Sequence, residues 1–166
     1  MADYASLLGG NADDTMLPGS VGRDDDAYYH LDSENVFLDR FASSGDSLVD
    51  ATDNPGAVRV ELGSGSDSVF GGSGSDSVWT GAGDDVAWGG GGNNTVSGAS
   101  GNDSIESGGG NDSLLGGSGS DYVEGGIGND ILRFSGDGAS DSGSGGSGTD
   151  TLDIDSAGAI VDSITQ

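Results

Sequence analysis

Eight consecutive nine-residue blocks run without a gap from Leu62 to Arg133, and they constrain this chain more than any other feature. Each block fits the pattern G-G-x-G-x-D-x-U-x, in which U is aliphatic, and a further block spans residues 145–153. Tandem units of a fixed short period are typical of solenoids, in which each repeat stacks on its neighbours. The eight blocks read LGSGSDSVF, GGSGSDSVW, TGAGDDVAW, GGGGNNTVS, GASGNDSIE, SGGGNDSLL, GGSGSDYVE and GGIGNDILR.

Within each block, the first six residues are predicted to turn and the last three to form a short strand. Side chains alternate along a strand, so position eight points inward while positions seven and nine point outward. Two blocks complete one coil, and each block stacks on the block two places later. The predicted fold is therefore all-β, a parallel β-roll or β-helix. Its inward column is Val69, Val78, Ala87, Val96, Ile105, Leu114, Val123, Leu132 and, after a break, Leu152.

The sixth position of each block carries an acid in all but one case, and stacking aligns these side chains into two ladders. Unit charges about 5 Å apart repel by about 3 kcal/mol at an effective dielectric constant of about 20. A hard divalent cation between successive turns reverses that sign, and Ca²⁺ accepts six to eight oxygen ligands in flexible geometry. The ladders are Asp67, Asp85, Asp103 and Asp121 on one edge, and Asp76, Asn94, Asp112 and Asp130 on the other, with Asp150 in the last block.

Other metals fit this chain less well. Mg²⁺ demands a tighter octahedron and keeps its waters. Zinc lacks its preferred ligands, since cysteine is absent and His30 is the only histidine. We expect about four to seven Ca²⁺ ions and a solenoid whose folding depends on them, because metal binding and folding then form one equilibrium. Asn94 supplies no charge, so ions around it should bind more weakly.

These blocks resemble the repeats of the RTX (repeats-in-toxin) family, whose nonapeptides form a serralysin-like parallel β-roll. The resemblance implies an extracellular protein exported by type I secretion and folded in external calcium. It also implies that the sixth-position residues are calcium ligands. Such repeats occur in toxins, proteases, lipases, adhesins and surface-layer proteins, so they indicate a fold and an ion rather than an activity.

The repeats divide the chain into three regions. Residues 1–61 form a non-repeat docking or capping region, in which 57–62 reads as a strand and 34–41 as a strand or a short helix. The β-roll spans 62–155, and within it residues 134–144 are a decayed coil or a loop, because Gly143 stands at the aliphatic position. Residues 156–166 are a tail available to cover the open end.

Composition excludes several classes of function. The formal net charge of −25 repels nucleic acid and anionic lipid, and no apolar run approaches a membrane span. The first ten residues lack the basic and apolar segments of a Sec-type signal peptide, which leaves type I secretion as an export route. His30 is the only histidine, so no second candidate is available for a Ser-His-Asp or Cys-His arrangement. No other enzyme motif occurs with the strand and helix that it requires around it. We therefore predict a non-enzymatic protein.

Aromatic residues concentrate near the first blocks. Position nine should face solvent, yet it holds Phe70, Trp79 and Trp88 in the first three blocks. Either residues 1–61 cover them in cis or they form a partner surface. The aromatics of the first region that would take part are Tyr28, Tyr29, Phe37 and Phe41.

The resulting hypothesis is a calcium-binding structural or interaction subunit of an extracellular assembly: a surface layer, an adhesive filament or the exterior of a virus particle. Its partners would be other proteins or further copies of the chain. The alternative is an accessory or secretion module of an RTX-type secreted enzyme. An ice-binding or adhesin module is a third class, disfavoured for ice binding because position seven lacks regular Thr or Asn.

Overall fold

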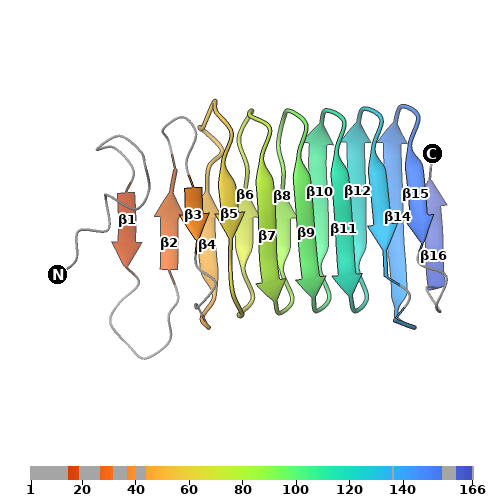
Figure 1. Ribbon diagram of the computed structural model, residues 1–166, viewed down its shortest axis with the longest axis horizontal. Helices are drawn as coiled ribbons and strands as arrows, with labels where there is room; N and C mark the ends of the chain where they lie inside the picture. Colours follow the sequence, from red (N-terminus) through yellow and green to blue (C-terminus); the bar gives the residue numbers. More distant parts are fainter. Residues whose placement is uncertain are drawn as a thin grey trace.

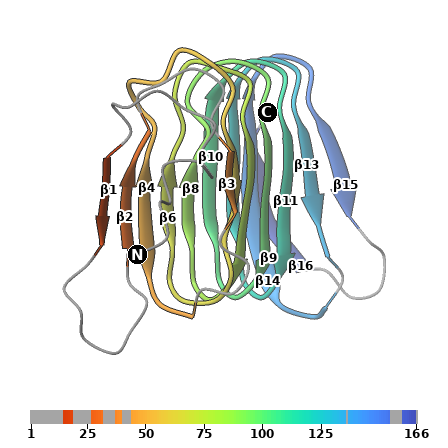
Figure 2. The ribbon, with the colours of Figure 1, turned by 60° about the vertical axis from the view of Figure 1, so that its left-hand side comes forward.

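The fold is a single parallel β-solenoid with two sheets facing each other (Figures 1 and 2). The computed structural model describes residues 15–18, 27–31, 37–39, 44–135, 137–154 and 160–165. No helix occurs in these ranges, and accordingly none there is long and apolar enough to cross a membrane. The prediction of an all-β parallel roll is confirmed.

Even-numbered strands from β2 onward, together with β1, form a nine-stranded sheet, and odd-numbered strands from β3 form a seven-stranded sheet. The first sheet contains β1 (Thr15–Pro18), β2 (Ala27–His30), β4 (Ser47–Asp50), β6 (Ser68–Phe70), β8 (Val86–Trp88), β10 (Ser104–Gly109), β12 (Tyr122–Ile127), β14 (Ser140–Ser147) and β16 (Ile160–Thr165). The second contains β3 (Phe37–Asp39), β5 (Arg59–Glu61), β7 (Ser77–Ala82), β9 (Thr95–Ser100), β11 (Ser113–Ser118), β13 (Ile131–Phe134) and β15 (Thr151–Ile154).

The strand register confirms that each block stacks on the block two places away. Ile105 of β10 pairs with Ala87 of β8 on one side and with Val123 of β12 on the other. These neighbours are aliphatic because position eight of every block points into the narrow space between the sheets. Apart from β1, which pairs antiparallel with β2, the ladders are parallel.

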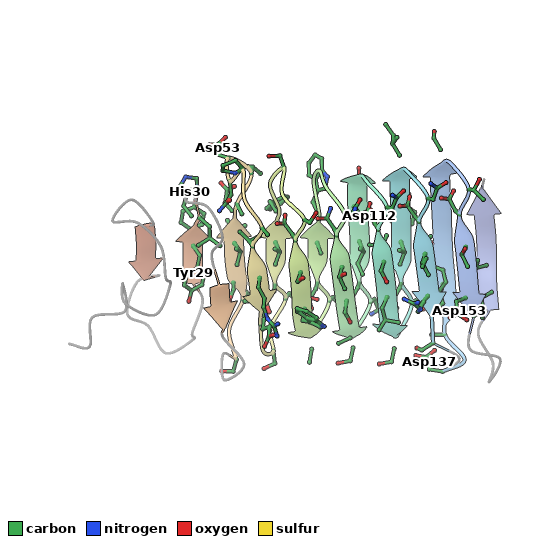
Figure 3. The ribbon with its side chains drawn as sticks, turned by 45° about the horizontal axis from the view of Figure 1, so that its top comes forward. Tyr29, His30, Asp53, Asp112, Asp137 and Asp153 are labelled. Carbon is green, nitrogen blue, oxygen red and sulfur yellow. The ribbon has the colours of Figure 1, made fainter. Side chains whose placement is uncertain are left out.

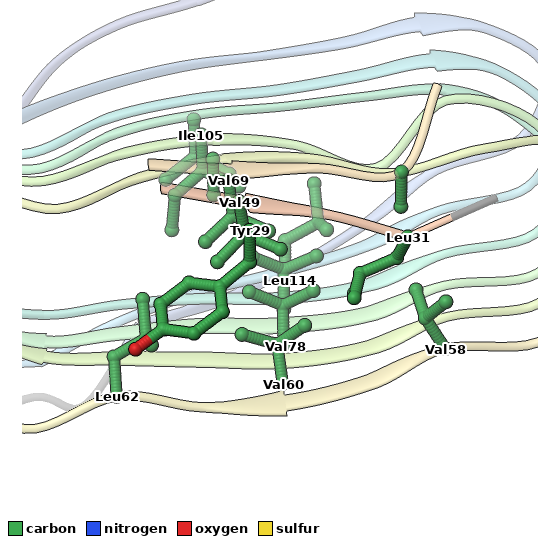
Figure 4. Close-up of a cluster of buried hydrophobic side chains, with 14 of the residues drawn as sticks. Tyr29, Leu31, Val49, Val58, Val60, Leu62, Val69, Val78, Ile105 and Leu114 are labelled. Carbon is green, nitrogen blue, oxygen red and sulfur yellow. The ribbon is translucent and has the colours of Figure 1, made fainter. Parts of the chain in front are cut away.

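A single continuous core runs along the inside of the solenoid (Figure 4). The eight position-eight residues from Val69 to Leu132 are each at most 3% exposed, and Leu152 packs against them while partly buried. Close coil packing needs glycine in the turns. At Gly128, with φ of 148°, an added Cβ would lie 1.5 Å from the carbonyl oxygen of Gly110.

Parallel stacking begins before the repeats. Tyr29 of β2 pairs with Val49 of β4, which pairs with Val69 of the first block, and all three side chains are buried. Alternation along β2 turns Tyr29 into the core, so its ring takes neither role considered from the sequence, covering the outward aromatics or contacting a partner. The stretch 34–41, ambiguous between strand and helix, contributes β3. The first region therefore supplies extra coils to the end of the stack.

The stretch 134–144 is a coil of the solenoid. Its strand β14 pairs with β12 and β16 in parallel, and the extra residues relative to a regular block lie between β13 and β14. Gly143 occupies the position-eight place, and the space left by its missing side chain is filled by the ring of Phe134. A Cβ on Gly143 would lie 2.8 Å from the Phe134 Cζ atom, and Phe134 is 2% exposed.

Candidate calcium ladders

The sixth-position side chains form two hydrogen-bonded ladders, one on each turn edge of the solenoid. In each ladder the Oδ1 atom accepts a hydrogen bond from a backbone N–H of the preceding coil, at N···O distances of 2.6–3.0 Å. Figure 3 shows Asp112 at one edge and Asp137, in the turn before Asp141, at the opposite edge. The structure thus brings the nine predicted ligands together in the two rows that the sequence indicated.

The second carboxylate oxygen is left over in most of these residues. Among the described residues, the buried Oδ2 atom lacks a hydrogen-bond partner in Asp67, Asp85, Asp103, Asp121, Asp130, Asp141 and Asp150. A buried, unpaired anionic oxygen is costly unless a cation or a donor compensates it. Each ladder therefore contains buried anionic oxygens whose loss of hydration is not compensated by a hydrogen bond.

Where position one is glycine, the absence of a side chain lets these oxygens approach the backbone closely. A Cβ on Gly98 would lie 2.1 Å from Asp103 Oδ2 and 2.6 Å from the carbonyl oxygen of Gly116 in the next coil. The same holds at Gly125, between Asp130 Oδ2 and the Gly145 carbonyl oxygen. We call each such pair of neighbouring oxygens, one from a ladder carboxylate and one from a carbonyl of the next coil, a cradle. Carboxylate and carbonyl oxygens are the donor set that Ca²⁺ prefers, so the residues present fit this ion.

No three His, Cys, Asp or Glu side chains converge on one point in the part of the chain that the structure describes. The cradles differ from such clusters because each combines a side-chain oxygen with backbone oxygens. A site of this kind depends on the stacking of coils and is absent from an unfolded chain.

Burial raises the pKa of seven ladder carboxyls, although a backbone hydrogen bond opposes the shift in each: Asp67, Asp76, Asp85, Asp103, Asp121, Asp130 and Asp141. The pKa of Asp103 rises to about 7, and those of Asp67 and Asp121 rise to about 6. Neighbouring carboxylates of the same ladder, such as Asp121 for Asp103, raise the pKa further. The metal-free ladder therefore resists holding its full negative charge at neutral pH.

These shifts give a pH prediction for the calcium-free protein. A folded-state pKa above the unfolded value near 3.8 means that the folded state binds more protons in between, so stability falls as pH rises from about 4 to about 7. We expect calcium-free protein to keep more β structure near pH 4.5 than near pH 7.5, as measured by circular dichroism. Asp103→Asn should flatten this dependence, and a β signal that rises with pH in both proteins would contradict the assignment.

The comparison with family models, like the geometry of the ladders, indicates calcium-binding repeats. The model described as "RTX calcium-binding nonapeptide repeat (4 copies)" matches residues 61–96 and 97–132. The repeats form an RTX-type parallel β-roll. No curated protein and no solved structure matches the chain significantly. Repeats of this kind bind calcium and are typical of secreted, extracellular proteins.

In this RTX roll, the ladder carboxylates and the turn carbonyls would hold the ions. Bound calcium supplies two positive charges between coils, where the protein alone has a stack of buried anionic oxygens. The protein's own contribution is to fix Oδ1 on the backbone of the preceding coil, which leaves Oδ2 turned toward the cradle.

Two sets of residues were missed by sequence reasoning. Asp141 extends the first ladder, since its Oδ1 accepts from the Asp121 N–H at 3.0 Å; its spacing of nine from Asp150 was the available signal. The position-five side chains form a second, outer ladder, in which each side-chain oxygen accepts from the backbone N–H of the following coil instead of the preceding one. Asn93 Oδ1 accepts from the Asn111 N–H at 2.7 Å, and Asn111 Oδ1 accepts from the Asn129 N–H at 2.8 Å. Short polar residues recur at position five in every block.

Asn94 places an amide where its neighbours place an oxygen. Its Nδ2 atom lies 2.8 Å from the position of a Cβ on Gly89 and donates to the Gly91 carbonyl oxygen at 3.4 Å. Asn94→Asp exchanges this donor for an anionic acceptor, so we expect tighter calcium binding and a higher melting temperature in calcium. Calorimetric titration of both proteins tests this, and equal affinities would show that charge at this position does not limit binding.

The candidate partner residues are distributed unevenly. Trp88 is 48% exposed and meets the half-buried Phe70 edge to face at 6.5 Å between ring centroids. Trp79 lies on the other sheet under the Arg59 guanidinium, 5.0 Å from its ring centroid, and Arg59 also pairs with Glu61. Tyr28 is half-buried, with its hydroxyl 3.5 Å from Asp50. The side chain of Phe37 and the whole of Phe41 lie outside the described part.

Proposed function

We propose that this chain is a non-enzymatic, calcium-binding structural or interaction subunit of an extracellular assembly, joined to further copies of itself or to other proteins. The observation that carries the proposal is an exposed apolar patch on the nine-stranded sheet. This patch consists of Leu48, Phe70, Val86 and Trp88, on the adjacent strands β4, β6 and β8.

The patch is unusual for a chain of this composition. Leu48, Val86 and Trp88 are 39%, 43% and 48% exposed, while the chain as a whole carries a formal charge of −25. Clustered exposed aromatic and aliphatic side chains mark protein interfaces more often than isolated ones do. The charge disfavours nucleic acid and anionic membranes as the occupant, because both would be repelled.

The two tryptophans are expected to have different roles. Trp79 contacts Arg59 of the first region, which supports a stabilising contact within the chain. Trp88 has a large exposed area and neighbours that leave it open, which supports a contact between chains. Of the two roles considered from the sequence, we therefore propose the contact within the chain for Trp79 and the contact between chains for Trp88.

The experiment compares Trp88→Ser with Leu115→Ser, which changes a 38% exposed residue on the opposite sheet. In calcium, Trp88→Ser should weaken self-association in sedimentation velocity while its monomer melting temperature stays within a few degrees of the parent. Leu115→Ser should leave both unchanged. A monomeric parent, or equal association in the parent and Trp88→Ser, would contradict a self-assembling subunit and favour a module that serves a separate chain.

A further inference from the structure

The two calcium ladders differ in how their second carboxylate oxygens are satisfied. The first ladder contains Asp67, Asp85, Asp103, Asp121 and Asp141, and every one of these residues has a buried Oδ2 atom with no partner among the described residues. All five side chains are at most 3% exposed. Along this edge, a bound cation would compensate a buried anionic oxygen at every member of the ladder.

In the first three members of the second ladder, the side chain either has a hydrogen-bond donor for its second oxygen or lacks that oxygen. Asp76 Oδ2 accepts a hydrogen bond from the Gly72 N–H at 3.2 Å. Asn94 carries an amide in place of the second oxygen. Asp112 Oδ2 lies 2.6 Å from the Ser107 hydroxyl oxygen. Only Asp130 and Asp150, the last two members, keep unpartnered Oδ2 atoms.

Ser107 stands at position one, where Gly98 and Gly125 let a ladder Oδ2 atom and a carbonyl oxygen of the next coil come close together. Its hydroxyl oxygen lies 2.6 Å from Asp112 Oδ2 and 2.6 Å from the Gly125 carbonyl oxygen. These are the two kinds of oxygen that bound the open cradles at Gly98 and Gly125. The hydroxyl group of Ser107 therefore lies between the two kinds of oxygen that meet directly at Gly98 and Gly125.

Thr80, a hydroxyl residue at position one on the first ladder, behaves differently. Its hydroxyl group points to the carbonyl oxygens of Ser97 and Gly98, at 3.5 and 3.2 Å. The Oδ2 atom of Asp85 is left unpartnered. The Thr80 side chain also approaches the Asp85 carboxyl, but it forms no hydrogen bond to the buried Oδ2 atom, whereas the Ser107 hydroxyl oxygen lies 2.6 Å from Asp112 Oδ2.

We infer that calcium loads the two edges of the solenoid unequally: the first ladder and the Asp130–Asp150 end of the second ladder take ions, whereas Asn94 and the Ser107 hydroxyl close the middle of the second ladder. Calcium binding is a property of the RTX repeats; the division between open and closed cradles is a property of these side chains. The inference is independent of the proposed assembly role.

A matched pair of substitutions tests the division. Asp103→Asn and Asp112→Asn each remove one charge from a residue that is 3% or 2% exposed, and Asn retains an Oδ1 atom to accept the backbone N–H. We measure the number of bound ions by calorimetric titration with CaCl₂ alone. Asp103→Asn should bind at least one ion fewer than the parent, whereas Asp112→Asn should bind the same number. Loss of an ion in Asp112→Asn, or no loss in Asp103→Asn, would overturn the inference.

A second pair remains informative if Asp103→Asn fails to fold. Ser107→Gly removes the hydroxyl group and opens a cradle between Asp112 Oδ2 and the Gly125 carbonyl oxygen, so it should gain one bound ion. Ser104→Gly, on the same strand at an exposed position, makes the same change in composition and should gain none. Equal ion counts in Ser107→Gly and the parent, or a lower count in Ser107→Gly, would show that the hydroxyl does not close the site.

Discussion

Replacing Phe134 with alanine is expected to destabilise the calcium-loaded protein by about 3–5 kcal/mol, the range for truncating a buried aromatic side chain. Phe134 is 2% exposed and supplies the apolar volume that Gly143 lacks at the position-eight place of β14. The cavity would lie in the coil that joins the regular repeats to the last block. Chemical unfolding in saturating calcium measures the change.

The reciprocal substitution makes this prediction specific. Gly143→Leu alone should destabilise by about 1–3 kcal/mol through overpacking, because its Cβ would lie 2.8 Å from Phe134 Cζ. The double variant Phe134→Ala with Gly143→Leu restores a position-eight aliphatic residue and should recover part of the loss. Ile154→Ala, at a 37% exposed position of β15, is the control and should cost less than about 1 kcal/mol. Additive losses in the double variant would contradict the filling role of Phe134.

The regular part of the fold was predictable because one local rule repeats. An aliphatic residue at position eight and a carboxylate at position six fix both the face and the register of each strand. The pairing of Ile105 with Ala87 and Val123 follows directly from that period. The same period placed Asp103 and Asp121 on one ladder, where the Asp103 N–H donates to Asp121.

The coils outside the repeats were not predictable from the period. Tyr29 and Val49 extend the inward column without any glycine pattern around them, so alternation alone could not show that they join the stack. At Gly143 the missing side chain is replaced by Phe134 from the facing sheet. Such compensation depends on three-dimensional proximity, and a pattern search along one block does not contain it.

The state of each cradle also required the structure. Position-one residues were treated as turn glycines, and Ser107 differs from them by one hydroxyl group. Only the 2.6 Å distance to Asp112 Oδ2 shows that this group contacts the ladder, whereas the hydroxyl of Thr80 lies 3.2 Å from the Gly98 carbonyl oxygen and leaves Asp85 Oδ2 without a hydrogen bond. The residue types at position six therefore predicted the two ladders, whereas the side-chain conformations determine which Oδ2 atoms have a hydrogen-bond partner.

Calcium withdrawal at neutral pH is expected to have the largest effect on this protein. An ion held at a concentration about a hundredfold above its Kd stabilises the folded state by about 2.7 kcal/mol. Two such ions already contribute about 5 kcal/mol, which equals the total stability of many domains. Without them, the buried Oδ2 atoms of the first ladder stay unpaired and repel one another. We therefore expect folding and calcium binding to be a single transition.

Circular dichroism with and without calcium tests this central claim most directly. In millimolar CaCl₂, the far-ultraviolet spectrum should be β-rich with a cooperative thermal transition. In excess EDTA near pH 7.5, the β signal should be lost, and it should return on adding CaCl₂ but not on adding MgCl₂ at the same concentration. A spectrum and a melting temperature that are unchanged in excess EDTA would contradict the assignment of the two ladders as calcium sites that hold the fold together.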